Sequence, residues 1–109
     1  MSPLFKQFYK QSLSQRLKAL EKAEYLDPDQ AGKLQSGELG LTHEAGDHMI
    51  ENYIGTYTLP MGLALHFLLD GKNYLVPMAI EEPSVIAAAS NGAKMVAQSG
   101  GFHTVKENR

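Results

Sequence analysis

The dipeptide Asp70-Gly71 constrains the fold of this chain more than any other feature of the sequence. It follows a largely apolar run from Leu63 to Leu69 and precedes a second run from Tyr74 to Val76. An Asp-Gly pair between two apolar runs is a strong hairpin signal, so we predict two strands joined by a tight turn. Pro77 continues the second run without a backbone donor, which indicates that this strand lies at an edge or bends there.

Helix start signals come before the hairpin, at three places in the chain. Ser12 and Gln15 have the spacing of a capping box. Asp27-Pro28 offers an N-cap followed by a proline at the first helical position, and that helix should end by Gly37. Thr42 is a plausible third N-cap. We therefore predict three helices within the first 55 residues.

The third predicted helix carries an apolar stripe. Its members recur with i, i+4 pairs, which is typical of one helix face, and they are Met49, Ile50, Tyr53 and Ile54. Gly55 and Pro60 close this region because neither favours a continuing helix. We therefore expect the helix to extend to about residue 55 and its apolar face to need a partner.

An alanine-rich segment follows the hairpin. Alanine is the best helix former and proline suits the first turn, so a helix should start at about Pro83 and end near Gly100-Gly101. Small residues from Ala87 to Ala93 would let another helix or a ligand approach its backbone closely. The pattern as a whole predicts an α+β fold, with N-terminal helices, a β-hairpin and a final helix.

Composition narrows the functional classes. The 109 residues fit one small domain or a piece of a larger one. The formal net charge of −2 argues against a nucleic-acid binder, which usually carries a clear basic excess. There is neither a transmembrane-length apolar run nor the apolar core of a secretion signal, so we expect a cytoplasmic location and no membrane partner. The lack of cysteine excludes disulfides and cysteine-based zinc sites or nucleophiles.

Two motif-like stretches do not fit the sites that they resemble. His43 and His48 lie five residues apart, which on a helix rotates the second from the first by roughly 140°, whereas a zinc-protease motif needs i, i+4 spacing. We expect solvated helix residues there and no metal. The stretch Gly37-Glu38-Leu39-Gly40 lacks the third glycine of a dinucleotide fingerprint and does not sit between a strand and a long helix.

Glu81 and Glu82 offer the most interesting chemistry in the sequence. They sit between a predicted strand and a predicted helix N-terminus, where the helix dipole favours a charged carboxylate. An adjacent carboxylate and partial burial act in the opposite direction. Such a pair can prepare one carboxyl group for general acid work while the other stays ionised. From the residues alone, ordinary acidity at a helix N-terminus is the simpler interpretation.

Two longer stretches resemble one enzyme family. Residues 51–56 read ENYIGT, which is similar to the ENVIG-type segment of 3-hydroxy-3-methylglutaryl-coenzyme A (HMG-CoA) reductases, with Tyr53 where valine is usual. Residues 76–90 read VPMAIEEPSVIAAAS and resemble the VPxxxEEPSVVAAAS segment of the class II, mostly bacterial, branch. The resemblance implies an incomplete piece of the large substrate-binding domain. Residues 1–56 would form a helical segment, residues 57–109 a partial large domain, and the cofactor domain would be absent.

The resemblance also implies a reaction. Members of the family use two hydrides from NADH or NADPH to convert HMG-CoA to mevalonate and free coenzyme A, and class II members also run in reverse. The family's catalytic glutamate falls on Glu82, which would donate or relay a proton to the thioester or aldehyde oxygen beside a lysine. Ser84 falls on a position that contacts the hydroxymethylglutaryl group. A basic residue that contacts coenzyme A aligns with Tyr9, so Lys10 beside it is the expected contact.

Assembly is the last property that the resemblance implies. The expected homodimer, or higher homo-oligomer, would have an interface containing Glu51, Asn52, Tyr53, Ile54 and Gly55. The 109 residues do not include the family's catalytic lysine and aspartate, its cofactor-binding segment or its C-terminal histidine. We therefore expect the chain alone to be inactive. The alternative is a non-catalytic assembly module, or the remnant of a truncated gene, that keeps only the dimer-forming surface.

Overall fold

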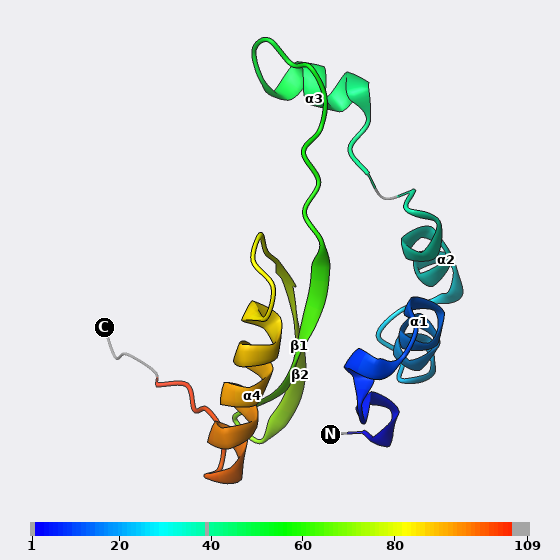
Figure 1. The fold of residues 1–109 in the computed structure, drawn as a ribbon. Coiled ribbons are helices and arrows are strands. Elements are labelled where there is room, and N and C mark those ends of the chain that lie inside the picture. The colour runs from blue at the N-terminus through cyan, green and yellow to red at the C-terminus, as the bar shows by residue number, and fades with distance from the viewer. Residues whose placement is uncertain (1, 39, 106–109) are drawn as a thin grey trace. The chain divides into compact units, whose positions relative to one another are not determined.

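The computed structural model describes residues 2–38 and 40–105. By its internal contacts the chain forms two compact units, residues 1–56 and 57–109. The first unit is helical, and the second combines a β-hairpin with one long helix (Figure 1), so the predicted α+β class is confirmed. Within the described residues, no helix has the length and apolar character needed to cross a membrane.

The first unit begins with two short 3-10 turns and continues with three α-helices. The turns are η1 (Pro3–Phe5) and η2 (Phe8–Lys10), and the helices are α1 (Leu13–Lys22), α2 (Pro28–Ser36) and α3 (His43–Met49). Its small core contains Phe5, Phe8, Leu17, Ala19, Leu20 and Ala31, all of them buried. Because α1 contacts both η1 and α2, this core forms around one face of α1.

The three helix starts follow the predicted caps. In α1, the hydroxyl of Ser12 accepts from the Gln15 amide at 3.1 Å, and the Gln15 side chain accepts in return from the Ser12 amide at 2.9 Å. Asp27 and Gln30 form the same reciprocal pair at α2. Thr42 caps α3 through the Ala45 amide at 3.1 Å. Each cap satisfies donors that a helix N-terminus otherwise leaves free, and all three predictions are confirmed.

The predicted extension of the third helix to about residue 55 is wrong. α3 ends at Met49, Ile50 is extended with φ −138°, and Asn52 takes a left-handed φ of 57°. The chain turns back after Ile50, so the ring of Tyr53 lies against Gly46 and does not continue a helical stripe. Tyr53 therefore packs against the preceding helix and does not continue the i, i+4 stripe from which a longer helix was predicted.

The second unit contains the predicted hairpin. Its strands are β1 (Met61–Leu69) and β2 (Lys72–Ala79), which pair antiparallel, with Leu69 opposite Lys72. Asp70 and Gly71 have φ values of 49° and 78°, the positive pair that a tight hairpin turn of this type requires. In the described part of the chain, β2 is hydrogen-bonded on one side only, which is compatible with Pro77 in that strand.

A β-bulge interrupts β1 in its middle. The pairing of Ala64 with Val76 is followed by that of Phe67 with Tyr74, so two residues of β1 oppose one residue of β2. His66, in the bulge, has a left-handed φ of 69°. The bulge turns the Leu65 amide out of the ladder, and this amide donates to the hydroxyl of Ser90 at 2.9 Å.

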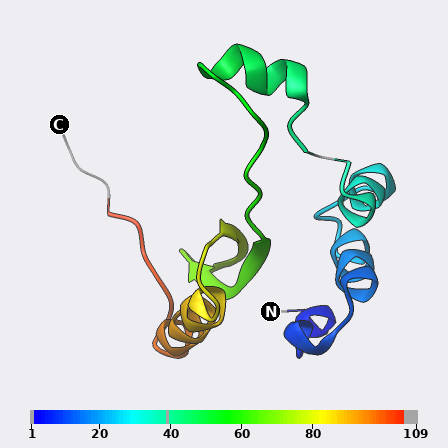
Figure 2. The ribbon, with the colours of Figure 1, turned by 45° about the horizontal axis from the view of Figure 1, so that its top comes forward.

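α4 (Val85–Gln98) packs along β1 (Figures 1 and 2). The contact is close because small residues meet there: Ala64 is 0% and Ala93 is 2% exposed. The helix begins two residues later than predicted, because Ser84 has a left-handed φ of 72° and so precedes the first helical residue. After the predicted glycine stop, Phe102 pairs with β1, donating to Leu68 O at 2.7 Å and accepting from the Asp70 amide at 2.9 Å.

Candidate active site

The segment Glu81–Ser84 joins the end of β2 to the start of α4, and both flanks are fixed on β1. On one side Ala79 pairs with Met61, and the Ile80 amide donates to Pro60 O at 3.3 Å. On the other side Ile86, in the first turn of α4, packs over Gly62 so closely that a Cβ there would lie 2.6 Å from Ile86 Cδ1. The four residues are therefore exposed but anchored at both ends.

Ser84 has the conformation that matters most in this segment. A left-handed φ of 72° is uncommon for a residue with a side chain and costs about 1 kcal/mol or more. Its carbonyl accepts from the Ala88 amide at 2.9 Å, yet its side chain makes no capping hydrogen bond. The first amides of α4 thus have no side-chain cap from Ser84, and together with its hydroxyl they can bind an oxygen-bearing ligand.

Glu81 and Glu82 are both exposed and both lie in the bend after β2. Because β2 ends at Ala79, the alternation of side chains along a strand does not assign the two carboxylates to opposite faces. Among the described residues, neither carboxylate is in a salt bridge. The structure therefore presents two accessible carboxylates beside the N-terminus of α4, where the helix dipole attracts negative charge.

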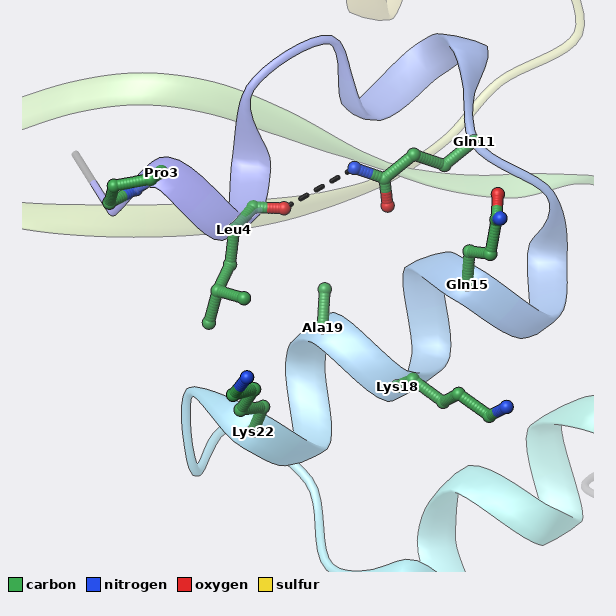
Figure 3. Close-up of a pocket in the computed structure, with 7 residues that line it drawn as sticks. All are labelled: Pro3, Leu4, Gln11, Gln15, Lys18, Ala19 and Lys22. Atoms are coloured by element: carbon green, nitrogen blue, oxygen red, sulfur yellow. Dashed lines mark hydrogen bonds between the residues drawn. The ribbon is translucent and has the colours of Figure 1, made fainter.

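Lys10 lies in the first unit, at the end of η2. Its ammonium group is 5.8 Å from the centroid of the Tyr9 ring, so the two adjacent residues form an exposed cation–π pair. A hollow of about 390 Å³ in the same unit does not include Lys10 (Figure 3). It is lined by Pro3, Leu4, Gln11, Gln15, Lys18, Ala19 and Lys22.

The hollow has a polar and basic rim that sequence reasoning did not single out. Gln11 Nε2 donates to Leu4 O at 3.4 Å, which ties the segment after η2 back to η1 (Figure 3). Lys18 and Lys22 recur at i, i+4 on α1 and so border the hollow from one helix. The i, i+4 lysine pair was visible in the sequence, but the fold-back of η1 onto α1 was not.

The segment Glu51–Gly55 follows α3, and its side chains differ widely in exposure. Ile54 is fully exposed, whereas Tyr53 is half-buried and its hydroxyl lies 2.8 Å from His43 Nδ1, at hydrogen-bond distance. Glu51 and Asn52 are exposed in the turn. The side chain of Tyr53 thus contacts the preceding helix α3, whereas the side chain of Ile54 is left in solvent.

His66 lies in the β1 bulge and Ser90 contacts the bulge from α4, and sequence reasoning assigned neither residue a function. Partial burial lowers the pKa of His66 below its usual value, and the positive charge of Lys94 lowers it further. Ser90 holds the bulge through its bond to the Leu65 amide. A bulge depends on the pairing of two strands, so periodicity within one strand does not reveal it.

The two stretches that do not fit metal or nucleotide motifs have local structural roles. His43 contacts Tyr53, and His48 Nδ1 donates to Glu44 O at 2.8 Å. Across residues 2–38 and 40–105, no three His, Cys, Asp or Glu side chains are grouped to hold a metal ion. Gly37 ends α2 with a left-handed φ of 79°, and no strand precedes that helix, so the described residues around it do not fit a dinucleotide cradle. Leu39, in the same stretch, lies outside the described residues.

Comparison with known proteins identifies one family. A model of the family named hydroxymethylglutaryl-coenzyme A reductase matches residues 12–109. The 3-hydroxy-3-methylglutaryl-coenzyme A reductase of Archaeoglobus fulgidus is 51% identical over 104 residues, which are 95% of this chain and 23% of that relative. The 3-hydroxy-3-methylglutaryl-coenzyme A reductase 2 of Dictyostelium discoideum is 46% identical over 55 residues, which are 50% of this chain and 10% of that relative.

Solved structures give the same result. A 3-hydroxy-3-methylglutaryl-coenzyme A reductase from Streptococcus pneumoniae is similar with a TM-score of 0.86 and 35% identity, over 100% of this chain and 25% of that chain. The class II reductase of that organism, bound to NADPH in open conformations, gives a TM-score of 0.82 and 35% identity, over 94% of this chain and 27% of that chain. The chain thus spans about a quarter of the length of these proteins and of the archaeal relative. It belongs to the hydroxymethylglutaryl-coenzyme A reductase family and, by its likeness to the pneumococcal enzyme, to the class II branch.

Proposed function

We propose that this chain contributes part of the substrate site of an enzyme that interconverts HMG-CoA with mevalonate and coenzyme A. The observation that carries the proposal is the family match over residues 12–109, which includes the exposed and doubly anchored segment Glu81–Ser84. Both hydrides would come from a nicotinamide cofactor, for which the described residues around Gly37 form no dinucleotide cradle. What this chain adds is a carboxylate, a set of amides and an exposed lysine.

In this proposal Glu82 is the catalytic residue. A carboxyl group that is exposed beside a helix N-terminus can reach a substrate carbonyl oxygen and donate or relay a proton to it as negative charge develops there. Ser84 binds the hydroxymethylglutaryl group through its hydroxyl, which is not used as a helix cap. The left-handed backbone of Ser84 supports this role, because strained residues gather where a ligand must be held.

Lys10 is proposed to contact coenzyme A. Its ammonium group is exposed and lies over Tyr9, so it can pair with a phosphate without breaking an existing ion pair in the described residues. A single exposed lysine contributes modestly to affinity. We therefore assign it to binding and not to the chemical step.

The segment Glu51–Gly55 is proposed to form an interface with a second copy of the same protein. Ile54 is 100% exposed, and Met49 and Ile50 just before the segment are 68% and 57% exposed. Apolar side chains gathered in this way favour association. The same observation favours the second candidate function, a non-catalytic assembly module, because the surface exists without the rest of an enzyme.

A chimera tests the proposal and separates the two candidates. The part of the Archaeoglobus fulgidus reductase that aligns with this chain would be replaced by this chain, a change supported by 51% identity over 104 residues. We expect HMG-CoA-dependent oxidation of NADH or NADPH by the purified chimera and none by the isolated chain. A chimera that folds and assembles like the parent enzyme but turns over no substrate would support the assembly module instead.

A further inference from the structure

We propose that His43, Gly46 and Tyr53 form a latch that holds the turn after α3 against that helix. The latch would set which apolar side chains of residues 49–54 stay outside. It is a conformational device within residues 43–54 and does not depend on the reductase reaction. Its consequence for a second copy of the chain rests on the proposed interface function.

The first argument is that α3 should not be stable by itself. It has only seven residues, and an isolated helix of that length is marginal in water. Gly46 lies in its middle, where glycine is less favourable than alanine. Thr42 caps the start of the helix, and the His48 ring donates back to Glu44 O within it, but these two bonds do not compensate for a weak centre. Something outside the helix must favour it.

Tyr53 is the contact that the geometry provides. A Cβ at position 46 would lie 2.5 Å from Tyr53 Cε2 and 2.7 Å from its Cζ, so the ring occupies the space that any other side chain would need. Gly46 is buried as a result, although the helix to which it belongs is mostly exposed. The glycine that weakens the helix is therefore the residue that lets the aromatic ring reach its backbone.

His43 completes the latch at the start of the helix. Its Nδ1 lies 2.8 Å from the Tyr53 hydroxyl, and the two rings lie 5.9 Å apart at an interplanar angle of 60°. The ring of Tyr53 thus spans almost one helix turn, from residue 46 back to residue 43. Valine at position 53 would have neither the hydroxyl nor the reach for this contact.

The latch divides the apolar residues of this region into two groups. Tyr53 is turned inward and half-buried, whereas Met49, Ile50 and Ile54 are left exposed. If Tyr53 were released, the turn at Asn52 would lose its only described side-chain tie to α3. Under the proposed interface function, a closed latch therefore presents Ile50 and Ile54 to a second copy in one fixed arrangement.

Proton NMR on the 109-residue chain tests the contact directly. We expect nuclear Overhauser effects between the Tyr53 ring protons and the Gly46 α-protons, with a ring-current shift of those α-protons. We expect the contact to persist in Tyr53→Phe, since the ring remains, with the loss of the bond to His43 weakening it. Absence of the Tyr53–Gly46 contact in the unaltered chain would overturn the latch.

A double-mutant comparison tests its energetics. Gly46→Ala alone should bring no gain in hydrogen-exchange protection of α3, because the added methyl displaces the ring. In a Tyr53→Val background the same substitution should slow exchange about fivefold, which is the usual advantage of alanine over glycine in a helix. Gly32→Ala in α2 is the matched control, since a Cβ there meets nothing within 4 Å, and it should slow exchange in both backgrounds. Equal slowing by Gly46→Ala in both backgrounds would contradict the latch.

Sedimentation of the same variants separates the latch from the interface. If the unaltered chain self-associates, Gly46→Ala should weaken that association and Gly32→Ala should not. A monomeric chain that still shows the Tyr53–Gly46 contact would remove the interface function and leave the latch in place. Association that is unchanged in Gly46→Ala, despite loss of the contact, would remove the link between the two.

Discussion

The two units of this chain differ in the sequence range of the interactions that stabilise each of them internally. In residues 1–56 every side-chain hydrogen bond in the described part joins residues at most 10 positions apart, as with His43 and Tyr53. In residues 57–105 the corresponding bonds join Leu65 to Ser90 and Asp70 to Thr104, which are 25 and 34 positions apart. The helical unit is thus a series of locally specified elements, and the hairpin unit depends on closing long loops.

This difference has a consequence for function. The proposed catalytic segment Glu81–Ser84 is in the unit with long-range ties, and both of its flanks are fixed on β1. The proposed coenzyme A contact, Lys10, is in the locally specified unit. A reacting group must be held in place with more precision than a phosphate contact, so this division matches the demands of the two roles.

The largest expected effect tests this division of roles. In the chimera, Glu82→Gln keeps the size of the side chain but removes the titrating group, so turnover should fall by roughly 10²- to 10⁴-fold with little change in binding. Lys10→Ala should instead raise KM by about fivefold and leave kcat unchanged, as expected for one exposed charge. Steady-state kinetics measure both effects.

Glu81→Gln is the control for the catalytic assignment. The substitution removes the charge next to Glu82 but keeps Glu82, the proposed proton donor, so the effect on turnover should be much smaller. If Glu81→Gln cripples the enzyme and Glu82→Gln is nearly silent, the assignment within the glutamate pair is wrong. If Lys10→Ala lowers kcat as strongly as Glu82→Gln, the proposed division between the units fails.

The second prediction concerns the packing of the hairpin unit. Gly101 has a φ of 86°, and a Cβ there would lie 2.6 Å from Leu68 O, so Gly101→Ala should destabilise the unit by about 2–4 kcal/mol. Gly92→Ala is the matched control, because a Cβ there meets nothing within 4 Å, and it should stabilise α4 by up to about 1 kcal/mol. Hydrogen exchange in urea would follow β1 and α1 separately. Equal loss of protection in α1 would show that the two units unfold as one.

The elements that were predicted correctly are those specified within a few residues. Ser12, Asp27 and Thr42 begin their helices because each cap and its partner are three positions apart. The Asp70-Gly71 turn was equally local, since it depends on the two residues that take positive φ. Local chemistry decided these elements, and the sequence displays it directly.

The features that were missed depend on residues that are distant or that turn back. The end of α3 is set by Tyr53 folding onto Gly46, which helical periodicity misread as a continuing stripe. The bulge at His66 depends on the register between two strands and on Ser90 in α4. The candidate residues Glu82 and Ser84 came from the resemblance to the family, because the chemistry of two adjacent glutamates is not distinctive by itself.

The third prediction tests the local character of the helical unit. Ser12→Ala removes one half of a reciprocal capping box, which should destabilise α1 by about 1 kcal/mol. Hydrogen exchange should accelerate in α1 and remain unchanged in β1 and α4. Ser12→Asp is the control, because an aspartate can cap the same amide and should restore protection. Faster exchange in α4 would mean that the helical unit supports the hairpin unit.

The smallest expected effect lies in the hairpin unit, at Asp70. Hydrogen bonds from the Thr104 hydroxyl at 2.7 Å and from its amide at 2.9 Å lower the pKa of this carboxyl group below its ordinary value of 3.8. A carboxyl group whose pKa is lower in the folded state stabilises the fold above its unfolded pKa. That contribution is lost as the pH falls through the folded pKa, so the hairpin unit should weaken only in acid.

Titration of the Asp70 carboxyl carbon by NMR measures this shift. Thr104→Val removes the hydroxyl, which is the largest cause of the shift, and keeps the amide, so the pKa of Asp70 should rise part of the way to its ordinary value. Asp70→Asn should remove the contribution of this site to the pH dependence of the hairpin unit. Asp70 and Thr104 both lie in the hairpin unit, so neither variant should alter hydrogen exchange in α1. If the pKa of Asp70 is unmoved in Thr104→Val, the hydrogen bond from the Thr104 hydroxyl to Asp70 does not form in solution. The hairpin unit would then depend less on long-range contacts than the comparison of the two units states.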